Sequence, residues 1–141
     1  AAMALEAAAT HAASPTHSEA TGHDAFRLSF LPETLPIVLD WDQMISRLMQ
    51  DAAGGGDSSR LAYCVHRAMA DAIAETCARS GHGVAVLSGG CFQNRILAEH
   101  AIAALERRGI GVFAHERVPP NDGGIALGQA AWACRKQRKE A

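Results

Sequence analysis

The sequence predicts an α/β fold in which a short, mostly parallel sheet is flanked by helices. Two apolar, β-branched runs, residues 84–87 and 110–114, each end at a polar turn with paired glycines, and a helical pattern follows each turn. A buried strand, a turn and a helix in this order are typical of parallel sheets covered by helices. The 141 residues correspond to about one domain, so we expect residues 1–141 to form a single domain.

The first part of the chain predicts a helix, a loop and a hairpin. Residues 1–10 are almost all alanine, which favours a helix that needs a neighbour to bury it. Residues 11–24 mix His, Ser, Thr, Pro and Gly without an apolar period, as a flexible loop does. Residues 26–30 and 36–39 have the patterns of short strands, and we expect them to form a hairpin.

Two helices should follow the hairpin. Asp40 or Asp42 is a candidate N-cap for the first, which ends before a triple glycine. Ser58 or Ser59 is a candidate N-cap for the second, and Gly81 signals its end by supplying a left-handed cap. The periodicity predicts which residues of these helices face the core. They are Met44, Ile45, Leu48 and Met49 in the first helix, and Leu61, Val65, Met69, Ile73 and Thr76 in the second.

The second half of the chain repeats one plan. Residues 79–94 and 107–127 each run from a helix end through Gly-x-Gly-Val, a short strand and a turn with paired glycines into a new helix. Because crossovers between parallel strands are right-handed, both turns should lie at one carboxyl edge of the sheet, where ligands bind. The inward residues should be Phe92, Ile96, Leu97, Ala101, Ala104 and Leu105 in a helix over 92–108, and Ile125, Leu127, Ala130, Ala131 and Trp132 in the last helix.

The first turn, Ser88-Gly89-Gly90, is a candidate ligand site. A glycine backbone can approach a ligand closely, and free N–H groups at a helix N-terminus favour an anion or a polar ring. Asn94, one turn into the predicted helix, can point its amide at the same place. The turn therefore has the chemistry to hold part of a nucleotide.

The second turn contains Asp122, for which two interpretations stay open. An aspartate just before a helix is commonly an N-cap, worth about 1 kcal/mol. The alternative is an oxygen ligand for a hard metal ion that holds the phosphates of a nucleotide. The spacing of the residues does not decide between them.

Two further side chains have simpler structural interpretations. His66 lies at the edge of an apolar helical stripe, where a packed histidine bonded to a backbone carbonyl is expected before a catalytic one. Cys91 follows the glycines at a helix start, a position that can activate a thiol. No histidine or acid adjoins it, so we expect a small core-facing residue.

Composition disfavours several classes of protein. The net charge of −2 provides no field for nucleic acid or for an anionic membrane. The four cysteines form no Cys-x-x-Cys pair, which favours reduced thiols. No apolar run approaches the roughly 18 residues of a spanning helix. We expect a soluble, cytoplasmic protein, and because the chain begins without methionine in a helical pattern, we expect part of a longer one.

Two longer motifs resemble one family. They are Leu87-Ser-Gly-Gly-Cys-Phe-Gln-Asn-Arg-Ile-Leu97 and, after His115, Val118-Pro-Pro-Asn-Asp-Gly-Gly-Ile-Ala-Leu-Gly-Gln-Ala130. These two motifs resemble the C-terminal end of the HypF-type carbamoyltransferases that mature nickel–iron hydrogenases. The resemblance covers nearly the whole chain and implies one lobe of the actin-like, sugar-kinase-like ATPase fold, related to the enzymes that form threonylcarbamoyladenosine in tRNA.

The resemblance implies an activity for the longer protein. Carbamoyl phosphate and ATP would form carbamoyl adenylate, and the carbamoyl group would pass to the C-terminal cysteine of a partner, HypE, towards the cyanide ligands of the hydrogenase. The matching motifs imply site roles as follows: nucleotide contacts for Ser88, Gly89, Gly90 and Asn94, one ligand of a divalent metal for Asp122, and a catalytic role for His115.

The resemblance also implies that the site is shared with a part of the protein outside this chain. The family holds its metal with a His-x-x-x-His pair in the preceding lobe, and no two histidines here are four residues apart. The isolated chain should therefore be inactive without the missing N-terminal domains. Two alternatives stay open, a partner-docking module with a vestigial nucleotide site and a relative that modifies tRNA.

Overall fold

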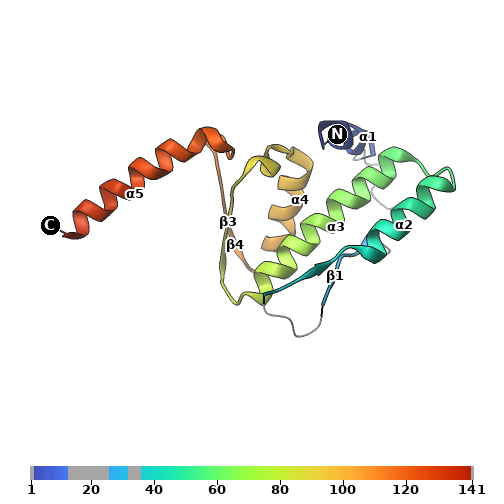
Figure 1. The fold of residues 1–141 in the computed structure, drawn as a ribbon, viewed down its shortest axis with the longest axis horizontal. Coiled ribbons are helices and arrows are strands. Elements are labelled where there is room, and N and C mark those ends of the chain that lie inside the picture. The colour runs from blue at the N-terminus through green and yellow to red at the C-terminus, as the bar shows by residue number, and fades with distance from the viewer. Residues whose placement is uncertain (1, 13–25, 32–35, 141) are drawn as a thin grey trace.

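The computed structural model describes residues 2–12, 26–31 and 36–140. In chain order, the elements are α1 (Ala2–Ala12), β1 (Ser29–Phe30), β2 (Leu39–Asp40), α2 (Asp42–Ala53), α3 (Ser58–Arg79), β3 (Val84–Leu87), the 3₁₀ turn η3 (Gly90–Gln93), α4 (Arg95–Glu106), β4 (Gly111–Ala114), the 3₁₀ turn η4 (Asp122–Gly124) and α5 (Ile125–Glu140). Helix α3 runs through the middle, with α1, α2 and α4 around it, while α5 extends away from this body (Figure 1). The predicted α/β fold is confirmed.

Strands β3 and β4 form a parallel pair, from Val84 opposite Gly111 to Leu87 opposite Ala114. Each strand follows a helix that ends at a glycine in the left-handed region, Gly81 and Gly109, both with a φ of 72°. Residues with a side chain rarely adopt that conformation, so glycine is needed at both helix ends. The predicted repeat of helix, glycine cap and strand is confirmed.

The predicted hairpin and N-terminal helix are also present. Strands β1 and β2 pair antiparallel over two residues each, so they are shorter than expected. Residues 32–35 between them lie outside the described part. Helix α1 packs on α3 and α4, and its Ala9 is fully buried. The predicted loop over 11–24 is wrong for its first two residues, which complete α1, and its remainder lies outside the described residues.

The helix starts differ from the sequence prediction. Helix α3 is capped by Asp57, whose carboxylate accepts a hydrogen bond from the Ser59 N–H at 3.1 Å, and not by either serine. Helix α2 has Trp41 at its N-cap without a side-chain bond, although Asp40 accepts from the Asp42 N–H at 3.0 Å. For α3 the bond from Asp57 already satisfies an early amide, so neither Ser58 nor Ser59 is needed as the cap. For α2 the early amide is satisfied by Asp40, one of the two predicted residues, although Asp40 lies one residue before the N-cap position.

The core lies where α3 and α4 cover one face of the parallel pair. Many of its residues are alanines, and small side chains at a contact let helix axes approach closely. The buried cluster consists of Ala70, Ala74, Ala85, Leu87, Leu97, Ala101, Ala104, Leu105 and Ile110. Five of the six residues predicted to face inward on α4 are buried, and the sixth, Phe92, lies in η3 and packs against this core.

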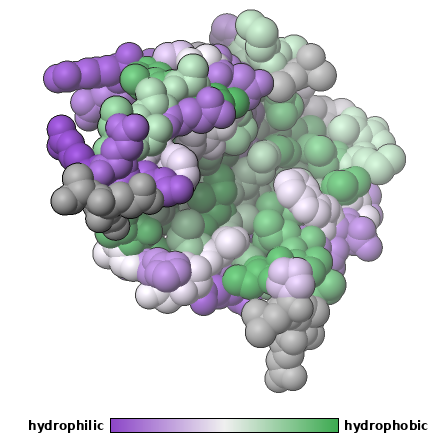
Figure 2. Space-filling model, turned by 60° about the vertical axis from the view of Figure 1, so that its left-hand side comes forward, coloured by the Kyte–Doolittle hydropathy of each residue, from purple (hydrophilic) through white to green (hydrophobic). Residues whose placement is uncertain are grey.

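The other face of the small sheet is open. Val86 and Phe113 are 70% and 65% exposed, because α3 and α4 both lie on the opposite side. The last helix was expected to turn five apolar residues inward, and this is wrong for all of them, since Ile125, Leu127, Ala130, Ala131 and Trp132 are exposed. Trp132 is 67% exposed. Figure 2, in which the α5 side comes forward, shows hydrophobic residues gathered around a hollow in the surface.

Helix α2 also leaves part of its apolar side uncovered. Met44 is buried and Leu48 is half-buried against the cluster beneath α2, as predicted. Ile45 and Met49 are exposed, contrary to the prediction, because α2 contacts α3 along one narrow face only. Within the described residues, no helix is both long and apolar enough to cross a bilayer.

Candidate functional site

The two glycine turns meet at the carboxyl edge of β3 and β4. The N–H of Gly89 donates to the carbonyl oxygen of Pro120 at 2.7 Å. The imidazole Nε2 of His115 lies 3.0 Å from the hydroxyl oxygen of Ser88. One hydrogen bond between backbones and one between side chains therefore join the turns into a continuous surface, as the strand order predicted.

Backbone conformation explains the glycine at position 89. Gly89 has a φ of 102°, which side chains rarely tolerate. A Cβ on Gly89 or Gly90 would lie no closer than 3.9 Å to any heavy atom beyond the adjacent residues, so crowding does not require glycine at either position. Because the Gly89 N–H is bonded to Pro120, this one N–H is not available to a ligand, contrary to the expectation for Gly89.

Asn94 has a structural role that the sequence did not reveal. The predicted helix over 92–108 is interrupted here, with η3 before Asn94 and α4 after it. The Asn94 Oδ1 caps α4 by accepting from the Leu97 N–H at 2.9 Å. Its Nδ2 lies 2.8 Å from the Nε2 of His66. Asn94 therefore links the start of α4 to the middle of α3.

His66 is buried, with 3% of its surface exposed. Its Nδ1 lies 2.7 Å from the carbonyl oxygen of Ala62, one helical turn earlier. The predicted packed histidine bonded to a backbone carbonyl is therefore confirmed. The contact with Asn94 spans 28 positions in the chain and leaves no periodic signal in the sequence.

A pocket of about 630 Å³ lies beside the first turn, between α1, α3 and η3. Its walls are mostly apolar, with a few polar groups. It is lined by Met3, Leu5, Glu6, His66, Met69, Gly90, Cys91, Gln93, Asn94 and Leu97. Cys91 is exposed, so the prediction of a core-facing residue is wrong, because η3 turns this side chain outwards where a continuous α-helix was expected.

The second turn is capped by Asn121 and not by Asp122. The Asn121 side-chain oxygen accepts from the Gly123 N–H at 3.0 Å. A Cβ on Gly124 would lie 2.9 Å from the Pro119 carbonyl oxygen, so close packing requires this glycine. Asp122 is exposed, and its carboxylate makes no hydrogen bond or ion pair with another described residue. The N-cap interpretation of Asp122 is thus wrong.

Asp122 fits one ligand of a metal site, but not a complete site. No group of three or more His, Cys, Asp or Glu side chains within residues 2–12, 26–31 and 36–140 is placed to hold a metal ion. An exposed, unpaired carboxylate is a suitable oxygen ligand for a hard divalent cation. Any such site would need further ligands from outside this set of residues.

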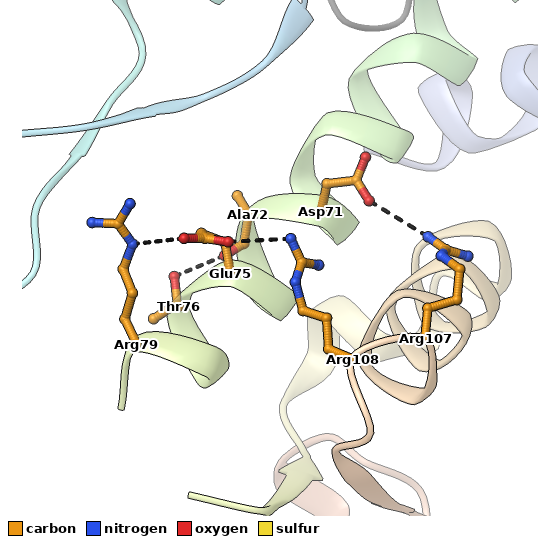
Figure 3. Close-up of polar contacts among 7 residues, drawn as sticks. All are labelled: Asp71, Ala72, Glu75, Thr76, Arg79, Arg107 and Arg108. Carbon is orange, nitrogen blue, oxygen red and sulfur yellow. Dashed lines mark hydrogen bonds and ion pairs between the residues drawn. The ribbon is translucent and has the colours of Figure 1, made fainter. Parts of the chain in front are cut away.

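A second cluster of charges lies at the opposite edge of the sheet, where α3 and α4 end (Figure 3). Glu75 accepts from Arg79 at 2.9 Å through one oxygen and from Arg108 at 3.2 Å through the other. The Arg79 guanidinium also lies 4.1 Å from the ring centre of Phe30. These contacts join α3, α4 and β1. The hydrogen bond from Arg79 is the main cause that lowers the pKa of Glu75.

Comparison with known proteins identifies relatives of one kind. Residues 1–129 match the family described as "Carbamoyltransferase, Kae1-like Domain, second subdomain". The chain is 42% identical over 93 residues to the carbamoyltransferase HypF of Rhodobacter capsulatus. It is 36% identical over 106 residues to a carbamoyltransferase HypF homolog of Cupriavidus necator.

A solved structure has the same fold. The crystal structure of full-length HypF "in the phosphate- and nucleotide-bound form" superposes with a TM-score of 0.74 at 29% identity, over 94% of this chain and 17% of that one. The alignment with the Rhodobacter protein covers 63% of this chain and 12% of that protein. The alignment with the Cupriavidus homolog covers 71% of this chain and 27% of the homolog. The chain thus spans a small part of the proteins that it matches.

Proposed function

Because the chain belongs to the HypF-type carbamoyltransferases, as the second subdomain of their Kae1-like domain, we propose that it forms one wall of a nucleotide site in a longer transferase. The longer protein would use carbamoyl phosphate and ATP, through carbamoyl adenylate, to carbamoylate the C-terminal cysteine of HypE. The observation that carries the proposal is the joining of the two glycine turns at one sheet edge through Gly89 and Pro120. A relative of the same fold was crystallised with phosphate and nucleotide.

The pocket beside the first turn would take the nucleoside of ATP or of carbamoyl adenylate. Its volume lies in the range of small-molecule sites, which are mostly apolar with a few polar groups that set orientation. Met3 and Met69 supply apolar walls, and Asn94 supplies an amide. Gly90 borders this pocket, and a Cβ on it would lie 4.0 Å from the Asn121 Cβ. The phosphates would therefore extend from the pocket towards the second turn.

The second turn would face the phosphates and a divalent metal. Asp122 would contribute one carboxylate ligand, and the preceding subdomain would contribute the others. The metal would neutralise phosphate charge when bound. Ser88 and His115, which are exposed and bonded to one another, would contact the nucleotide or the transferred group from the first turn and the end of β4.

Replacement of Asp122 tests the metal and phosphate assignment. In the full-length protein, we expect Asp122→Ala to abolish carbamoyl transfer to HypE without changing the thermal midpoint, because the side chain is exposed and unpaired. Asp42→Ala is the matched control, since it removes an exposed carboxylate far along the chain at the start of α2. Full transfer activity in Asp122→Ala would contradict the assignment.

A partner-docking role is the second candidate. It is favoured by the exposed apolar residues of α5, Ile125, Leu127 and Trp132. Calorimetry on this chain joined to its first subdomain separates the two functions. ATP binding supports the nucleotide site, whereas association with HypE in the absence of ATP binding supports docking with a vestigial site.

A further inference from the structure

The contacts of His66 determine its protonation state. A carbonyl oxygen can only accept, so the Nδ1 at 2.7 Å from the Ala62 oxygen carries a proton. The Asn94 Oδ1 already accepts from the Leu97 N–H, which identifies the other amide atom, at 2.8 Å from His66, as the NH₂ group. An NH₂ group donates, so the His66 Nε2 must be an unprotonated acceptor. The contacts are satisfied together by a neutral imidazole with its proton on Nδ1.

This chain of bonds orients the Asn94 amide. Amide nitrogen and oxygen have nearly the same shape, so an isolated asparagine can present either atom to a ligand. Here the oxygen is directed to the N-terminus of α4 and the nitrogen to His66. A reversed amide would place its NH₂ against the Leu97 N–H and leave the His66 acceptor without a donor, which costs about 1–3 kcal/mol for a buried group.

The orientation decides what Asn94 offers to the pocket. Both His66 and Asn94 line the pocket next to Gly90. The Asn94 nitrogen has two protons and uses one on His66, and its oxygen has one further lone pair. The amide therefore keeps one donor and one acceptor, which can both pair with polar atoms of a ring.

We propose that His66 is a positioning residue, which holds the Asn94 amide in the one orientation that recognises the nucleoside of the bound nucleotide. This inference rests on the proposed nucleotide site. His66 acts through Asn94, and its own ring nitrogens are both occupied by protein contacts. The ligand contact is made by the Asn94 amide, with Met69 and Gly90 as neighbouring walls of the pocket.

The test compares two replacements of His66 in the full-length protein. His66→Leu fills the space without an acceptor, whereas the side-chain oxygen of His66→Gln can accept from Asn94. We expect His66→Leu to raise the KM for ATP about tenfold, the equivalent of one lost hydrogen bond of about 1.4 kcal/mol, with a smaller change in kcat. His66→Gln should recover most of the affinity. In combination with Asn94→Ala, His66→Leu should have little additional effect, because both act through the same amide.

His100→Leu is the matched control. This half-buried histidine stacks edge-on against Tyr63 at 5.2 Å between ring centres and has no contact with Asn94, so its replacement should leave the KM for ATP unchanged. If His66→Leu and His66→Gln lose affinity equally, or if affinity changes only in proportion to the loss of stability in all three variants, the positioning role is overturned.

Nuclear magnetic resonance on the unmodified protein tests the inference without relying on a variant that folds. The ¹⁵N shifts of the His66 ring should identify the Nδ1-protonated tautomer, and ATP should shift the side-chain amide signals of Asn94. Binding of ATP that leaves the Asn94 amide signals unchanged overturns the role of His66 but not the nucleotide site. Failure of the unmodified protein to bind ATP overturns both.

Discussion

His115 and Ser88 stand at the ends of neighbouring parallel strands, and a hydrogen bond of 3.0 Å joins the imidazole Nε2 to the hydroxyl oxygen. Both side chains are exposed. Exposed side chains contribute little to stability, so we expect this pair to add little to the joining of the turns by Gly89 and Pro120. In the proposed site, both side chains would contact a ligand at the sheet edge.

If His115 contacts the transferred group as proposed, we expect His115→Ala to reduce carbamoyl transfer by the full-length protein at least about tenfold, which corresponds to about 1.4 kcal/mol of transition-state stabilisation. The unfolding free energy should change by less than about 0.5 kcal/mol. Transfer assays and urea unfolding measure the two quantities. His82→Ala, another exposed histidine, is the control, and equal activity of the two variants would remove His115 from the site.

Removal of the Glu75 carboxylate should weaken the junction between α3 and α4. Glu75→Gln loses its charge towards Arg79 and Arg108, and since all three side chains are partly exposed, we expect a loss of at most about 1 kcal/mol. Glu99→Gln is the matched control, because its ion pair with Arg95 is 3.6 Å long and more exposed. Urea unfolding at pH 7 measures the difference.

The same variant should lose its effect in acid. Arg79 lowers the pKa of Glu75 below the ordinary value of 4.5, so the folded protein releases the proton more readily than the unfolded chain. The resulting stability is present above the unfolded pKa and is lost as the pH falls through the lower folded pKa. The difference in unfolding free energy between the unmodified protein and Glu75→Gln should therefore become smaller below pH 4.5. A difference in unfolding free energy that stays constant until Glu75 is fully protonated would contradict this account.

Truncations of two large apolar residues should have very different costs. Leu105 is fully buried between α3, α4 and the strands, so Leu105→Ala should cost about 2–5 kcal/mol. Trp132 is 67% exposed on α5, so Trp132→Ala should change the stability of this chain by no more than about 0.5 kcal/mol. Urea unfolding of the chain measures both changes in unfolding free energy. A large loss of unfolding free energy in Trp132→Ala would mean that α5 packs on the rest of the chain in solution.

The cysteines should differ in reactivity. Burial raises the pKa of the Cys64 thiol, against a smaller opposing effect of Arg60 and Arg67, so less of the reactive thiolate is present at a given pH. Cys91 and Cys134 are exposed. Iodoacetamide followed by mass spectrometry should label Cys91 and Cys134 in the folded chain and Cys64 only after unfolding. Labelling of Cys64 at the rate of Cys91 would contradict the burial of this thiol.

Local signals were sufficient for most of the elements. The left-handed conformations of Gly81 and Gly109 follow from a glycine at the end of a helical pattern, which depends on neighbouring residues only. The strand patterns after them predicted β3 and β4, and the handedness of crossovers placed both glycine turns at one edge. The contact of Ser88 with His115 agrees with that placement.

The periodicity of a helix could not predict which other elements pack against it. The pattern of α5 shows which residues share a face, but whether that face is buried depends on what packs against it, and Ile125 and Leu127 are exposed. Cys91 was expected in the core because a continuous helix was assumed, whereas η3 turns it outwards. The cap at Asp57 was missed since several polar residues beside a helix start have similar preferences.

The sequence by itself determined the α/β plan, the strand order and the family motifs, because these follow from residue types at short spacing. Only the tertiary structure decided that Asn94 is held by His66, that the Gly89 N–H is bonded to Pro120 and that Asp122 is left unpaired. Those relationships join residues that are far apart in the chain or depend on the path of a single turn, and hydrogen-bond geometry exists only once the chain has folded.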